Sequence, residues 1–129
     1  MKKVIFIGGF YNILFVILHF SFWKMFEWGS ELSKLSTVNS GVMQILNIQI
    51  IYYFIFTAVI CFAFPTELQS TKLGKYFLVG TAVFWLVRTV QQFVFLGADS
   101  VAATCMAASF YLIGAVLFLI PVCWKKVSR

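Results

Sequence analysis

The chain has 129 residues, of which 62% are hydrophobic and 11% are charged, and its formal net charge is +6. Soluble domains are about 25% charged, and a chain of this length cannot bury so much apolar surface in a soluble core, so we expect a bilayer to be its solvent. No basic run is interleaved with aromatic residues, which argues against a nucleic-acid partner and assigns the positive charge to membrane lipid headgroups.

The first apolar run covers residues 4–23 and follows Lys2 and Lys3. The apolar core of a secretory signal is about 7–15 residues long, and no small-residue cleavage site follows this run, so we expect a retained transmembrane helix. In residues 25–35 apolar side chains recur at helical spacing among charged ones. This pattern predicts a short interfacial helix or a continuation of the first span.

Three further apolar runs cover residues 42–64, 76–96 and 101–121. Each is close to the roughly 20 residues that a helix needs to cross the hydrocarbon core, and none alternates as a strand would. A four-residue connection between the last two runs favours antiparallel neighbours. We therefore predict an all-α membrane protein, with residues 1–129 forming a single antiparallel bundle of four transmembrane helices.

The distribution of Lys and Arg predicts the orientation of this bundle. Positive residues are enriched in cytoplasmic loops, and the two termini and the 65–75 connection share one side of the membrane. Only Lys24 and Lys34 lie on the other side. We therefore expect both termini to be cytoplasmic in a multi-pass plasma-membrane protein, with a bacterial inner membrane favoured. The seven residues that set this orientation are Lys2, Lys3, Lys72, Lys75, Lys125, Lys126 and Arg129.

Polar side chains gather at similar depth in the outer half of three predicted spans. Counted at about 1.5 Å per residue, four of them lie roughly 6–8 Å below the outer boundary and the fifth, an arginine, lies about 12 Å below it. Because polar groups are costly in hydrocarbon, they mark a candidate ligand-binding site. Its residues are His19, Asn47, Arg88, Gln91 and Gln92.

Arg88 is the least expected residue of this group. An arginine at mid-membrane costs about 2.5–3.5 kcal/mol on insertion scales, and no Asp or Glu lies within any predicted span. It can bind an anionic small molecule or lipid headgroup, or it can hold helices together through hydrogen bonds. It can also reach an acid at the outer surface. Its candidate protein partners are Asn12, Gln91, Gln92, Trp85, Glu27, Glu31 and Asp99.

No pattern predicts catalysis, a metal site or a cofactor. His19 is the only histidine, and Cys61, Cys105 and Cys123 are far apart in sequence. We favour a non-catalytic accessory or structural membrane subunit, in a homo-oligomer or a larger membrane complex. The alternative is a small-molecule or anion binding or transport bundle with an outward-facing polar pocket around Arg88. A membrane enzyme acting on lipid is the least favoured interpretation, because it requires a nucleophile–base pair or paired carboxylates.

The orientation makes a direct prediction for two serines in opposite connections. Single cysteines introduced as Ser36→Cys and Ser70→Cys, in a background without native cysteines, are exposed to an impermeant thiol reagent outside intact cells. We expect the reagent to label position 36 and not position 70, because the 65–75 connection carries the cytoplasmic charge. Labelling at position 70 would show that the 65–75 connection lies outside the cell and that the predicted orientation is wrong.

Overall fold

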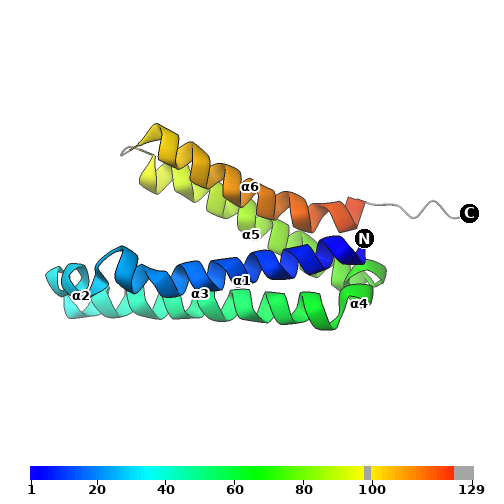
Figure 1. Cartoon of the computed structure of the whole chain (residues 1–129), viewed down its shortest axis with the longest axis horizontal. Helices are drawn as coiled ribbons and strands as arrows, with labels where there is room; N and C mark the ends of the chain where they lie inside the picture. The colour runs from blue at the N-terminus through cyan, green and yellow to red at the C-terminus, as the bar shows by residue number, and fades with distance from the viewer. Residues whose placement is uncertain (98–99, 124–129) are drawn as a thin grey trace, which may run out of the picture. The chain divides into compact units, whose positions relative to one another are not determined.

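The computed structural model describes residues 1–97 and 100–123, and every regular element among them is helical. Four long helices account for most of the chain: α1 (Lys2–Met25), α3 (Thr37–Ala63), α5 (Lys72–Leu96) and α6 (Val101–Cys123) (Figure 1). Three short elements complete it: α2 (Trp28–Glu31), the 3-10 turn η1 (Leu32–Lys34) and α4 (Pro65–Ser70). The all-α prediction is confirmed. Some residues used above lie outside the described residues: Asp99, Lys125, Lys126 and Arg129.

Each long helix is long enough and apolar enough to cross a membrane. In the most apolar 18-residue window of each helix, no more than 33% of the residues are buried. The remaining apolar side chains are exposed, including Phe10 at 67% and Phe95 at 77%. Water would penalise so much exposed apolar surface and lipid does not, which is what a small multi-pass integral membrane protein requires.

The chain divides into two compact units. One unit contains residues 1–8 together with the described residues from Cys61 onward, which include α4, α5 and α6. The other contains residues 9–60, which include most of α1, α2, η1 and α3.

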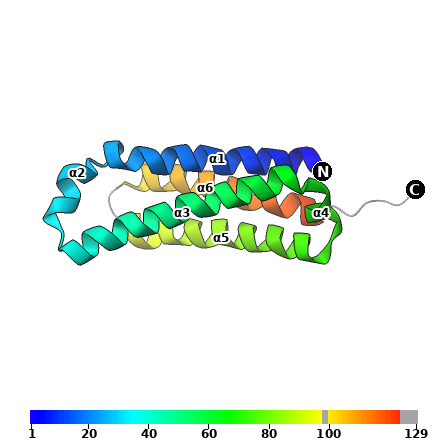
Figure 2. The same ribbon diagram turned by 90° about the horizontal axis from the view of Figure 1, so that it is seen from below.

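In the first unit, α5 and α6 lie side by side along their length (Figures 1 and 2). Small side chains on α6 permit this close approach, as is usual between helices in lipid. At one end of the pair, the Thr104 hydroxyl donates a 3.0 Å hydrogen bond to the Leu96 carbonyl. The buried side chains of the two helices include Leu78, Ala82, Trp85, Ala108, Ala115 and Phe118.

In the unit of residues 9–60, aromatic contacts join α1 to α3. The ring of Phe54 lies 5.5 Å from that of Phe15 and 5.3 Å from that of His19. The first helix does not continue through residues 25–35, because Glu27 adopts a left-handed conformation with φ 48° after α1 has ended at Met25. The chain then forms α2 and η1, whose position at the membrane interface stays a prediction.

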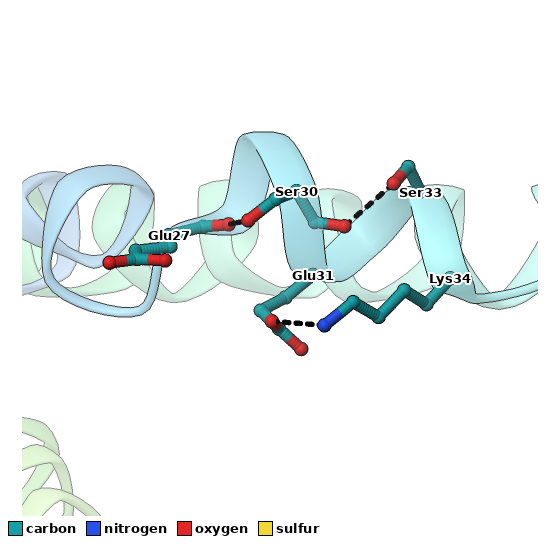
Figure 3. A network of polar contacts seen from close by, with 5 residues as sticks. All are labelled: Glu27, Ser30, Glu31, Ser33 and Lys34. Atoms are coloured by element: carbon teal, nitrogen blue, oxygen red, sulfur yellow. Dashed lines mark hydrogen bonds and ion pairs between the residues drawn. The ribbon is translucent and has the colours of Figure 1, made fainter.

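Local polar contacts hold the α2–η1 segment together (Figure 3). The Ser30 hydroxyl donates to the Glu27 carbonyl at 3.0 Å, and the Ser33 hydroxyl donates to the Ser30 carbonyl at 2.6 Å. Lys34 and Glu31 form an exposed ion pair at 2.6 Å. Such a surface pair contributes little stability, but it gives Glu31 a cationic partner within its own segment.

The corner between α4 and α5 is closely packed around Gly74. The Thr71 hydroxyl caps α5 by accepting a 2.9 Å hydrogen bond from the Gly74 amide. A Cβ atom at position 74 would overlap the Glu67 carbonyl oxygen and the Leu68 Cα, and would lie 2.7 Å from the Leu68 carbonyl oxygen. Because these are backbone atoms, the corner has no flexible side chain that can yield.

Gly74→Ala is therefore expected to destabilise the protein by about 1–3 kcal/mol, the usual cost of overpacking. Gly80→Ala is the matched control, because Gly80 lies on the same helix and a Cβ there meets nothing within 4 Å. Denaturant titration in detergent micelles, followed by loss of helical circular dichroism, measures both variants. Equal stability of the two variants would show that the α4–α5 corner is not closely packed.

Candidate functional site

The five predicted site residues are divided between the two units. His19 and Asn47 belong to the unit of residues 9–60, whereas Arg88, Gln91 and Gln92 lie on α5 in the other. Each group is described below within its own unit. The ligand-binding site predicted from these five residues stays a prediction.

The guanidinium of Arg88 is bound by side chains of both α5 and α6. Its Nη2 donates a 3.1 Å hydrogen bond to Oε1 of Gln92 and another, also of 3.1 Å, to the hydroxyl of Tyr111. Its Cζ lies 4.4 Å from the centroid of the Tyr111 ring, which is within cation–π range. Arg88 is thus held by a neighbour one turn along its own helix and by an aromatic residue of the adjacent helix.

A buried tryptophan packs against the tyrosine ring of this contact. The rings of Trp85 and Tyr111 stack with centroids 6.1 Å apart and an interplanar angle of 17°. Trp85 is fully buried, so it fixes the plane of the tyrosine ring. The sequence suggested Trp85 itself as a cation–π partner for Arg88, but the structure places Tyr111 in that role.

Tyr111 is the residue of this contact that sequence reasoning missed. The fourth predicted span looked featureless, since a tyrosine within an apolar run is unremarkable in a membrane helix. One signal was available: Tyr111 is the only tyrosine in residues 101–123, and it lies about mid-span, away from the interfaces that tyrosines prefer.

Part of the hydrogen-bonding capacity of Arg88 is unused. A guanidinium has five N–H donors, and both hydrogen bonds of Arg88 come from Nη2. Nε and Nη1 have no hydrogen-bond acceptor among residues 1–97 and 100–123. Arg88 is half-buried and Gln91 is exposed, whereas Gln92 is buried. The α5–α6 pair therefore binds one nitrogen of the guanidinium, Nη2, and leaves Nε and Nη1 available.

The second group, His19 and Asn47, connects α1 to α3. Nδ2 of Asn47 donates a 3.1 Å hydrogen bond to the backbone carbonyl of His19. The imidazole lies among aromatic rings, stacked on Phe54 with an interplanar angle of 19° and edge-on to Phe22 at 4.5 Å. This geometry is that of a helix–helix contact in which the backbone of His19, rather than its ring, receives the polar group.

Within the described ranges, no three or more His, Cys, Asp or Glu residues come together as metal ligands. The three cysteines are free thiols, with Cys61 buried and Cys105 and Cys123 exposed.

Comparisons of the chain with protein-family models, with curated proteins and with solved structures found no match.

The Asn47 contact predicts a measurable loss of stability. Asn47→Leu removes the hydrogen bond to the His19 carbonyl, and interhelical hydrogen bonds in membranes contribute about 0.6 kcal/mol on average, with a maximum of about 1.7. Gln49→Leu is the control, because Gln49 is exposed on the same helix. Denaturation in mixed micelles should show Asn47→Leu to be the less stable variant. If Gln49→Leu costs as much, the Asn47 contact does not stabilise the protein.

Proposed function

We propose that this chain is a non-catalytic accessory or structural membrane subunit, with four antiparallel transmembrane helices and both termini in the cytoplasm. The observation that carries this proposal is the binding of the Arg88 guanidinium by Gln92 and Tyr111. This contact gives Arg88 a structural use, because Nη2 of its guanidinium joins α5 to α6 through Tyr111.

The energetics support a structural use of this arginine. Lipid cannot solvate a guanidinium, so an isolated Arg88 would carry the insertion cost of about 2.5–3.5 kcal/mol. Two hydrogen bonds and the face of Tyr111 replace part of the lost hydration. Gln92 belongs to α5 and would stay, but a shifted or rotated α6 would remove the hydroxyl and ring of Tyr111 from Arg88. The Tyr111 contact therefore favours one register of the two helices.

The exposed lysines support the proposed orientation. Lys2 and Lys3 are exposed at the start of α1, and Lys72 and Lys75 are exposed in the first turns of α5. The electrostatic attraction between each such lysine and a cytoplasmic leaflet with anionic lipids contributes about 1 kcal/mol. Lys34, on the proposed outer side, is already paired with an acid of its own segment.

One observation favours a second candidate function, the binding or transport of an anionic small molecule. The N–H groups on Nε and Nη1 of Arg88 are available, and Gln91 is exposed three residues further along α5. These groups can bind a carboxylate or phosphate. This function predicts an anion that copurifies with the wild-type protein in mild detergent and disappears in Arg88→Leu, as mass spectrometry would detect.

The structural proposal predicts energetic coupling between Arg88 and Tyr111. Stabilities of Arg88→Leu, Tyr111→Phe and the double variant are measured by denaturation in mixed micelles. We expect the cost of Tyr111→Phe to fall by about 0.6–1.7 kcal/mol when Arg88 is already absent, because the hydroxyl then has no guanidinium to accept from.

Tyr76→Phe serves as the control for this cycle, because Tyr76 is an exposed tyrosine of α5. Its effect should be the same with and without Arg88. If Arg88→Leu and Tyr111→Phe are additive to within about 0.3 kcal/mol, the proposed link between α5 and α6 is absent.

A further inference from the structure

We infer that Arg88 is the polar centre of an interface with a transmembrane helix of a partner protein, and that it pairs there with an Asp or Glu side chain of that helix. This inference rests on the proposed accessory function and names the chemistry of the partner. Nε and Nη1 of Arg88 carry N–H donors that the α5–α6 pair leaves available to such a partner.

The charge of Arg88 has no counter-ion within the long helices. The chain contains four acidic residues, and none lies within α1, α3, α5 or α6. Glu31 already pairs with Lys34. Gln92 and Tyr111 supply hydrogen-bond acceptors but no negative charge. Ionised residues within membranes pair with one another or with backbone carbonyls. An opposite charge is the partner that the chain does not place at this depth, and the proposal assigns it to the partner helix.

Depth favours a side chain over a lipid headgroup as this anion. Arg88 lies eight residues before the end of α5 at Leu96, and Tyr111 lies ten residues after the start of α6 at Val101. At about 1.5 Å per residue, the contact lies roughly 12–15 Å along either helix from that end. Lipid phosphates lie outside the hydrocarbon, whereas a carboxylate on a transmembrane helix can be placed at the same depth as Arg88.

The surface around Arg88 has the pattern of a helix-binding face. Phe84, Arg88, Gln91 and Phe95 are separated by four, three and four residues, which places them on one side of α5. Phe84 is half-buried, and Gln91 and Phe95 are exposed. An apolar helix with one central acid complements this face, because its apolar surface meets the phenylalanines and its carboxylate accepts from Arg88 and Gln91.

The test uses a defined probe and the full-length protein. The protein is reconstituted in phosphatidylcholine vesicles with one of two synthetic transmembrane peptides of Leu and Ala. One peptide carries a single central Glu and the other carries Gln at the same position. Energy transfer between a donor on the protein and an acceptor on the peptide reports association.

We expect the wild-type protein to bind the Glu peptide about tenfold more tightly than the Gln peptide, which corresponds to about 1.4 kcal/mol. Arg88→Gln should abolish this preference. Arg88→Lys should retain part of it, because the charge remains while the planar guanidinium is lost. Lys75→Gln is the matched control: it removes one positive charge from the exposed start of α5 and should leave the preference intact.

Equal binding of the two peptides to the wild type would overturn the inference, as would a preference that survives in Arg88→Gln. Arg88-dependent binding of benzoate, measured by titration calorimetry and found without a peptide preference, would also overturn it and assign Arg88 to a small anion. The proposed function is tested separately. Intact Arg88–Tyr111 coupling without a peptide preference removes only this inference, whereas absent coupling removes the structural role of the arginine.

Discussion

A guanidinium within an apolar helix must be solvated by protein, and this requirement organises the α5–α6 pair. Arg88 cannot exchange its hydration for lipid, so its helix and the neighbouring helix must supply polar atoms at its depth. Gln92 and the Tyr111 hydroxyl do so, and Trp85 fixes the tyrosine ring. An exposed surface charge would impose no such condition on helix register.

The unit of residues 9–60 follows the same rule with a neutral group. The amide of Asn47 is buried and donates to a backbone carbonyl of the facing helix. In both units interhelical polar contacts supplement aromatic or small-residue packing. Such hydrogen bonds are individually weak, because polar groups of separated helices also find partners, but each depends on the arrangement of its two helices.

Hydrophobic run length predicted the four long helices well, because helix length in a bilayer is set by hydrocarbon thickness. The predicted end of the second span at residue 64 matches α3, which ends at Ala63, since the residue before Pro65 is driven out of the helical region. The run pattern did not predict the break at Glu27, which depends on a left-handed backbone conformation that no residue type there signals.

The candidate site was predictable only in part. Depth counting identified Arg88, Gln92 and Asn47, because polar residues in apolar runs stand out. It could not find Tyr111, whose phenol is compatible with lipid and whose role depends on the rotation of α6 about its axis. It also could not predict that Asn47 bonds the backbone of His19 instead of its ring, since a sequence pattern does not show backbone acceptors.

The central claim is that Tyr111 and Gln92 bind the Arg88 guanidinium, and nuclear magnetic resonance of that guanidinium in bicelles tests it most directly. The chain has only two arginines, Arg88 and Arg129, so Arg88→Lys assigns the signal. The structure predicts distinct, slowly exchanging Nη protons with nuclear Overhauser contacts to the Tyr111 ring. Averaged Nη protons with no contact to that ring would contradict it.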